Sequence, residues 1–288
     1  MKKKAKFPLG IRSYHDLMFH APHPTQNRVL IGVPMTGLVR SEWAFARMCQ
    51  VIPCNWSSSD SVHWLPQSSP IGYAVAEARN IIADQAVQQG FEWLLFIDHD
   101  VVMPPDAFVR LNEYILDGSV PVVSGLYFAK CHPPSPLLYR GRGNGHYKGW
   151  KIGDKVWVDG LPMGITLISV KVLRAMWLDA APYVAGGDKR VRKVFDTPYG
   201  INVDPEQRSW NSFAGTEDLA WCNRVIAGRY LQKAGFKAVG RREYPFLVDT
   251  ALFCKHITND GMVYPLDFQT VEQALVERER KTRRRLAT

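Results

Sequence analysis

Short apolar runs that end in turn residues or in charges are the feature that most limits how this chain can fold. Residues 28–34 form a β-branched apolar run that ends in a proline, and residues 92–97 form a second run that leads directly into the acidic segment 98–100. Such short runs, without polar alternation, are typical of strands buried on both faces of a sheet. The two runs therefore predict central strands of an α/β fold.

Segments with helical spacing of apolar residues separate the predicted strands. Further strands are predicted at 120–125, 165–170, 237–240 and 246–248, and helices at 41–51, 71–90, 171–178, 217–234 and from Pro104 onward. Residues 179–210 show little periodicity and predict a long connection of the kind that often forms a lid or a binding loop. Over the first ~130 residues strands alternate with helices, which is the pattern of an α/β domain.

Length and composition favour one folded domain. The chain has 288 residues, of which 46% are hydrophobic and 22% charged, and a chain of this size buries enough surface to fold without disulfides or metals. Its five cysteines form no CxxC pair, which predicts a reducing, cytoplasmic environment. We expect a basic N-terminal extension over residues 1–27, the folded domain over 28–262 and a basic C-terminal helical tail over 263–288.

No membrane span is expected, because the apolar runs are much shorter than the ~20 residues that a span requires. The Lys-rich start lacks the apolar segment of a signal peptide. Peripheral contact with a membrane stays open. The formal net charge of +9 lies partly in the two ends of the chain, and either solvated tails or an anionic partner would account for it.

Asp98 and Asp100 follow a predicted central strand, at the sheet edge where open α/β proteins bind their ligands. Two carboxylates this close repel each other unless a cation or a shared proton lies between them. Their oxygens suit a hard divalent cation, whereas the alternative is a simple strand-terminating turn. His256 follows another apolar run and is a candidate further ligand, although a single histidine also fits a surface or core position.

Glu217 and Asp218 stand at the start of a predicted helix. Acidic residues at this position stabilise the helix dipole, and this is the structural interpretation. The functional interpretation is a general base, because a carboxylate near a cation can take the proton of an attacking hydroxyl.

Several motifs, in this order along the chain, resemble those of GT-A glycosyltransferases of the family-2-like type. They are VLIGVP at 29–34, ARN at 78–80, LLFIDHD at 94–100 with Pro104 after it, VDGLPMG at 158–164 and TED at 216–218. The resemblance covers roughly residues 28 to 258. It implies a GT-A fold, that is, a Rossmann-like mixed sheet flanked by helices, in a single domain.

The resemblance also implies a metal-dependent enzyme that moves a sugar from a nucleotide-diphosphate sugar to an acceptor. Asp98 and Asp100 would form the DXD motif and hold Mn²⁺ or Mg²⁺ together with His256. Asp218 would be the catalytic base, with Glu217 in reserve. The residues implied on the nucleotide-sugar side are Val33, Pro34, Met35, Thr36, Arg79, Asp98, His99, Met163 and Gly164.

Two segments differ from the family pattern. The first-strand loop reads Met-Thr-Gly-Leu at 35–38 without the usual Tyr-Asn pair, and no Gln-x-x-Arg-Trp segment follows residue 218. The donor base stays open, and so do processivity and oligomeric state. An inverting course is favoured over a retaining one, and the acceptor is a saccharide, an anionic polymer or a nucleic acid. The alternative functions are a nucleotidyltransferase acting on sugar phosphates and a basic nucleic-acid-binding protein without turnover.

Overall fold

The structure is a computed structural model, and it describes residues 27–53, 62–64, 66–141, 146–204 and 209–265. All but the last residue of the predicted N-terminal extension, Asn27, which begins β1, and all but the first residues of the predicted C-terminal tail lie outside the described residues. Within the described part, none of the helices combines the length and the apolar character needed to cross a membrane.

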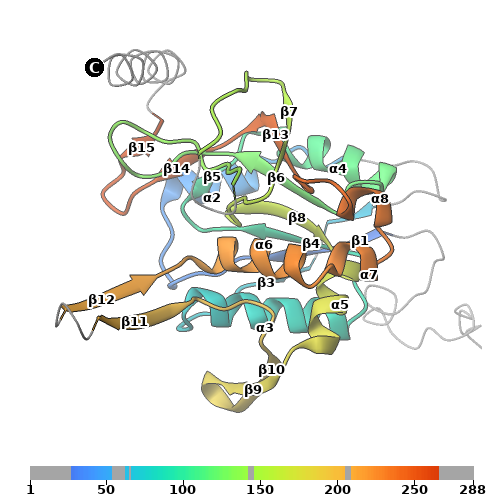
Figure 1. Ribbon diagram of the computed structural model, residues 1–288. Helices are drawn as coiled ribbons and strands as arrows, with labels where there is room; N and C mark the ends of the chain where they lie inside the picture. The colour runs from blue at the N-terminus through green and yellow to red at the C-terminus, as the bar shows by residue number, and fades with distance from the viewer. Residues whose placement is uncertain (1–26, 54–61, 65, 142–145, 205–208, 266–288) are drawn as a thin grey trace, which may run out of the picture.

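A mixed sheet forms the centre of the protein (Figure 1). Its strand order is β2-β1-β4-β8-β6-β13-β7, with β3 also beside β1. The strands are β1 (Asn27–Gly32), β2 (Val62–His63), β3 (Gln67–Ser68), β4 (Trp93–Ile97), β6 (Val122–Leu126), β7 (Lys155–Val158), β8 (Ile165–Ser169) and β13 (Phe246–Phe253). β8 runs antiparallel to both β4 and β6, whereas β1 is parallel to β4 and β13 is parallel to β6. The carboxyl ends of these parallel strands and the start of β8 therefore meet at one edge.

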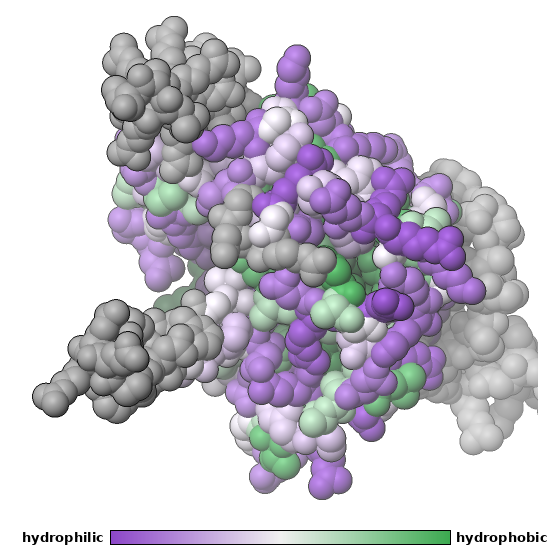
Figure 2. Space-filling view, in the orientation of Figure 1, coloured by the Kyte–Doolittle hydropathy of each residue, from purple (hydrophilic) through white to green (hydrophobic). Residues whose placement is uncertain are grey.

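Helices cover both faces of the sheet (Figure 1). One layer is α3 (Val75–Gln88), α5 (Val170–Asp179), α6 (Glu217–Ala227), α7 (Tyr230–Lys233) and α8 (Lys237–Gly240), and the other is α2 (Ser41–Met48) and α4 (Ala107–Asp117). The side chains of β4 alternate between the layers, with Leu94 and Phe96 in one core and Trp93, Leu95 and Ile97 in the other. This explains the unbroken apolar run. The outward side of the layer that contains α6 is largely hydrophilic (Figure 2).

Smaller elements surround the central sheet and its two helix layers. β5 (Val101–Val102), β14 (Lys255–Ile257) and β15 (Val263–Tyr264) form a three-stranded sheet, and two hairpins are formed by β9 (Pro182–Ala185) with β10 (Lys189–Arg192) and by β11 (Tyr199–Asp204) with β12 (Ser209–Ala214). The short 3-10 helix η1 (Gly186–Asp188) connects β9 to β10. The β11–β12 hairpin extends away from the main body (Figure 1).

The structure confirms the predicted mixed α/β architecture and most predicted elements, and it corrects three of them. Residues 237–240 form helix α8, not a strand, because a four-residue apolar segment carries no distinguishing period. The connection 179–210 contains β9, β10 and β11. The single helix predicted over 217–234 is two helices, α6 and α7, because Arg229 takes a left-handed conformation with φ of 53° that interrupts the helical path.

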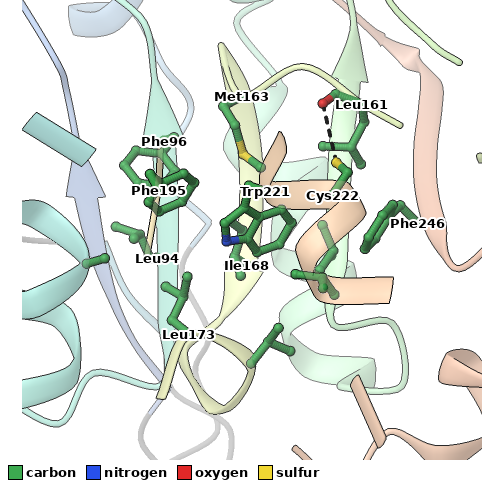
Figure 3. Packing of buried hydrophobic residues seen from close by; sticks show 14 of the residues in the cluster. Leu94, Phe96, Leu161, Met163, Ile168, Leu173, Phe195, Trp221, Cys222 and Phe246 are labelled. Atoms are coloured by element: carbon green, nitrogen blue, oxygen red, sulfur yellow. Dashed lines mark hydrogen bonds between the residues drawn. The ribbon is translucent and has the colours of Figure 1, made fainter. Parts of the chain in front are cut away.

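Trp221 anchors α6 to the sheet (Figure 3). Its ring stacks on Phe195 at a centroid distance of 5.8 Å and contacts Phe246 of β13 at 6.0 Å. The thiol of Cys222, the next residue, donates to the carbonyl oxygen of Leu161 at 3.7 Å. These contacts fix the direction of α6, so that its N-terminus reaches the edge of the sheet where the parallel strands end.

We expect Trp221→Ala to lower the free energy of unfolding by about 3–5 kcal/mol, because it leaves a large cavity between α6 and the sheet. Urea denaturation monitored by circular dichroism measures this loss. Phe45→Ala is the matched control, since this ring is 64% exposed and its removal should change stability by less than about 0.5 kcal/mol. A loss below about 1 kcal/mol for Trp221→Ala would contradict the anchoring role.

Candidate functional site

The acidic segment after β4 is fixed by contacts with neighbouring loops. The amide of Asp98 donates to the carbonyl oxygen of Gly164 at 2.8 Å, and the indole of Trp43 donates to the carbonyl oxygen of Asp98 at 2.8 Å. Nδ1 of His99 lies 3.2 Å from the carbonyl oxygen of Pro34, in the loop after β1. The three segments that the sequence singled out around residues 34, 98 and 164 therefore meet at one place.

Two adjoining pockets open at this edge of the sheet. The first pocket has a volume of about 210 Å³ and is lined by Pro34, Met35, Thr36, Tyr73, Val75, Ala78, Asp98, His99 and Asp100. The second pocket has a volume of about 440 Å³ and is lined by Thr36, Leu38, Val39, Arg40, His99, Asp100, Ile257, Thr258 and Asn259. Thr36, His99 and Asp100 belong to both. Together the pockets form a cleft of the size that small-molecule ligands use.

Asp100 lines both pockets and is contacted by His256 and Lys130, which line neither of them. Nε2 of His256 lies 3.2 Å from Oδ2 of Asp100, and Nζ of Lys130 lies 2.5 Å from the same oxygen. The amide of Ile257 donates to the carbonyl oxygen of Asp100, which ties β14 to this loop. Burial opposes ionisation of Asp100, but hydrogen bonds and positive charge from His256 and Lys130 outweigh it and hold the pKa of this carboxyl well below its usual value.

The two nitrogens of the His256 ring have different partners. Nδ1 lies 2.9 Å from the carbonyl oxygen of Phe128, and because a carbonyl only accepts, Nδ1 must carry the proton. Nε2 faces Oδ2 of Asp100. A protonated ring donates to this carboxylate, whereas in a neutral ring both atoms are acceptors and a cation between them would relieve their repulsion.

Asp98 is bound differently from Asp100. One guanidinium nitrogen of Arg79 donates to both carboxylate oxygens of Asp98 at 2.9 Å, and Nε donates to Glu217 at 3.0 Å. The Arg79 side chain is only 1% exposed and lies over the ring of Phe96, 4.9 Å from its centroid. Burial opposes its charge, but the two carboxylates outweigh this and raise the pKa of the guanidinium. Arg79 thus joins the end of β4 to the start of α6 and does not line either pocket.

Asp218, the second residue of α6, has a half-buried carboxyl group whose Oδ1 accepts the amide of Leu219 at 2.7 Å. Burial and the neighbouring charge of Glu217 raise its pKa. A carboxylate with a raised pKa takes up a proton more readily, which is the property of a general base. Glu217, in contrast, is already engaged by Arg79.

The remaining predicted residues, Val33, Met163 and Gly164, are buried and line neither pocket. Gly164 has no room for a side chain, because Val101 and the Tyr127 hydroxyl occupy the space where a Cβ would project. The hydroxyl of Tyr127 also accepts the amide of Gly164. The space next to Gly164, where a donor sugar was predicted to approach, is occupied by Tyr127.

The structure does not gather the three predicted metal ligands into one cluster. Across the described residues, no group of three or more His, Cys, Asp or Glu side chains is arranged to hold a metal ion. Asp100 and His256 are adjacent, whereas both oxygens of Asp98 face Arg79. The metal role of these residues stays a prediction, as does the nucleotide role of Arg79.

Two tyrosines, one that contacts His256 and one that lines the first pocket, were not singled out from the sequence. Tyr127 lies edge-on to His256, with the ring centroids 5.3 Å apart, and it follows β6 directly. The rule that pointed to Asp98, a position just after a central strand, therefore also points to Tyr127. Tyr73 lines the first pocket, but it precedes a helix and carries no comparable signal.

Comparisons with known proteins assign no family. No protein-family model matches the sequence, and no curated protein does. The structure is similar to A197 from STIV, with a TM-score of 0.46 and 18% identity over 82% of this chain and 92% of that one. It is also similar to a putative glucose-1-phosphate thymidylyltransferase from Bacillus anthracis in complex with a sucrose, with a TM-score of 0.28 and 11% identity over 52% and 74%. Likenesses this distant do not bear on function.

We expect Arg79→Met to destabilise the protein by about 3 kcal/mol at neutral pH, because it leaves two partly buried carboxylates without their cation. Without the guanidinium, both acids should have raised pKa values in the folded state. The deficit relative to wild type should therefore shrink as the pH falls and the acids become protonated. Urea denaturation at about pH 7 and about pH 5 measures this trend.

Arg110→Met is the matched control, since it removes an exposed ion pair with Asp106 and should cost less than about 1 kcal/mol at either pH. If Arg79→Met lowers the free energy of unfolding by the same amount at both pH values, the loss does not come from Asp98 and Glu217 left without their cation.

We expect Asp218→Asn to raise the free energy of unfolding at neutral pH. A folded-state pKa above the unfolded value means that stability falls as the pH rises through the interval between the two, and the amide removes this cost. The gain over wild type should shrink as the pH falls toward the usual aspartate pKa of 3.8. Thermal unfolding across this pH range tests it, and a variant less stable than wild type at neutral pH would contradict the raised pKa.

Proposed function

We propose that this protein is a glycosyltransferase with a GT-A fold, which moves a sugar from a nucleotide-diphosphate sugar to an acceptor with the help of a divalent cation. One observation carries the proposal: Asp100 lines both pockets at the carboxyl edge of the parallel strands, and Nε2 of His256 lies 3.2 Å from its carboxylate. In open α/β sheets this edge is the usual place for ligands.

The donor atoms fit a divalent cation. Nδ1 of His256 is bonded to a backbone carbonyl, which is the usual way that a metal-binding histidine is oriented, and this leaves Nε2 directed at Asp100. A cation bound by Asp100 and His256 would complete its shell with diphosphate oxygens and water, as Mg²⁺ commonly does. Lys130, which contacts the same Asp100 oxygen, would be free to turn toward the phosphates.

The chain's own residues have separate roles in the proposed reaction. Asp218 takes the proton of the acceptor hydroxyl as that oxygen bonds to the anomeric carbon and the bond to the donor diphosphate breaks. Lys130 stabilises the negative charge left on the diphosphate. A bound divalent cation would supply Lewis-acid stabilisation of the same charge. In this proposal the acceptor attacks opposite the leaving group, which inverts the anomeric centre.

Asp98 has a supporting role in this proposal. Its carboxylate is bonded to Arg79 through both oxygens, so it positions the loop that carries Asp100. The first pocket, lined by Met35 and Thr36 from the loop after β1, would receive the nucleoside.

The proposal predicts metal-dependent stabilisation by one class of nucleotide. We expect a thermal-shift panel of uridine, guanosine, cytidine and thymidine diphosphates to raise the melting temperature for one of them, and only with Mn²⁺ present, because binding to the folded state stabilises it. Asp100→Ala should abolish the shift. Asp179→Ala is the matched control, because Asp179 also pairs with a lysine, Lys233 at 2.7 Å, but outside the cleft.

Transfer is measured separately, as release of nucleoside diphosphate from the matching nucleotide sugar. Asp100→Ala and Asp218→Asn should each lower this rate by at least about 100-fold. Release of pyrophosphate from a nucleoside triphosphate and a sugar phosphate would instead identify a nucleotidyltransferase. Salt-dependent nucleic-acid binding without turnover would contradict the enzyme proposal.

A further inference from the structure

The first pocket has two chemically different walls. Tyr73, Val75 and Ala78, from the start of α3 and the residues before it, supply ring and aliphatic surface. The loop after β4 supplies the carboxylate of Asp100, next to Asp98, whose two oxygens are bonded to Arg79. A ligand that fits both walls has a flat apolar part, which lies against the ring and aliphatic side chains. It also has an anionic part, which a cation would link to the carboxylate.

Tyr73 is held in place by the β9–β10 hairpin. Its hydroxyl donates to the carbonyl oxygen of Gly186 at 2.9 Å. A Cβ at position 186 would lie 3.2 Å from the Tyr73 ring, so glycine allows the hairpin to pack closely there. Nζ of Lys189, on β10, lies over the ring, 5.9 Å from its centroid. The ring is thus pinned at its hydroxyl end and contacted by a cation, although it lies at the pocket wall.

The β9–β10 hairpin that holds Tyr73 is itself packed against α3. Ile81 of α3 packs with Ala185 and Val191 of the hairpin in a small separate core. The amide of Gly186 also donates to Glu77 of α3 at 3.3 Å. A side chain held in one orientation loses little conformational entropy when a ligand stacks on it.

We infer that Tyr73 forms a nucleobase subsite, in which the base of the nucleotide stacks on the tyrosine ring. This inference rests on the proposed function and adds to it the residue that recognises the base. Two residues that line the first pocket have aromatic rings, Tyr73 and His99. Tyr73 supplies the larger and more apolar ring, whereas Nδ1 of His99 lies 3.2 Å from the carbonyl oxygen of Pro34. Every nucleobase has a π face, so stacking here favours nucleotides over base-free phosphates without choosing one base.

The test compares ligands with and without a base. Titration calorimetry measures the affinity of wild type and variants for uridine and guanosine diphosphates and for inorganic pyrophosphate, all with Mn²⁺. Tyr73→Ala should weaken binding of both nucleotides by about tenfold or more, the size of a lost stacking contact. Pyrophosphate affinity should not change, because the phosphate end of the cleft is intact.

Two further variants separate stacking from simple loss of bulk or of fold. Tyr73→Leu keeps an apolar side chain without a π face and should weaken nucleotide binding almost as much as Tyr73→Ala. Tyr73→Phe keeps the ring, loses the bond to Gly186, and should lose no more than about threefold. Tyr199→Ala is the control, since this tyrosine is 68% exposed and lines neither pocket.

The outcomes distinguish this inference from the proposed function. If wild type binds neither nucleotide nor pyrophosphate, both are wrong. If wild type binds nucleotides and Tyr73→Leu binds them equally well, only the nucleobase subsite is wrong. An equal loss of affinity for nucleotides and pyrophosphate in the Tyr73 variants would also overturn it, because the effect would then be structural.

Discussion

The contact between Arg79 and two carboxylates, Asp98 and Glu217, holds the candidate site together. A guanidinium that is 1% exposed cannot be left without anions, since an isolated buried charge is very unfavourable. Satisfying it draws the end of β4 and the start of α6 to the same point. The loop that carries Asp100 and the helix turn that carries Asp218 both take their positions from this contact.

The same network gives the two residues of each acidic pair, Asp98 with Asp100 and Glu217 with Asp218, different partners. Asp98 and Glu217 are engaged by Arg79, whereas Asp100 and Asp218 lie beside them with different partners. The environments also move the pKa values of the two remaining acids in opposite directions, down for Asp100 and up for Asp218. One acid is thereby suited to bind a cation and the other to accept a proton, which are the two roles in the proposed transfer.

Much of the architecture is predictable from local pattern. Residues 93–97 are all buried, because both faces of β4 are covered by helices, and such a strand produces a continuous apolar run. The β9–β10 hairpin was missed for the opposite reason. Only Val191 among the residues of β10 is buried, so the hairpin carries little apolar alternation that a sequence pattern reveals.

The sequence by itself determined the succession of central strands and helices along the chain and the position of the acids at strand and helix ends. These positions in turn indicate the edge of the sheet where chemistry is expected. Only the tertiary structure decided which acids pair with Arg79, which nitrogen of His256 faces Asp100, and that Tyr73 lines the first pocket. These contacts join residues that are far apart in the sequence, such as Arg79 and Glu217. Local periodicity predicts elements, but a hydrogen bond between distant residues depends on how those elements pack.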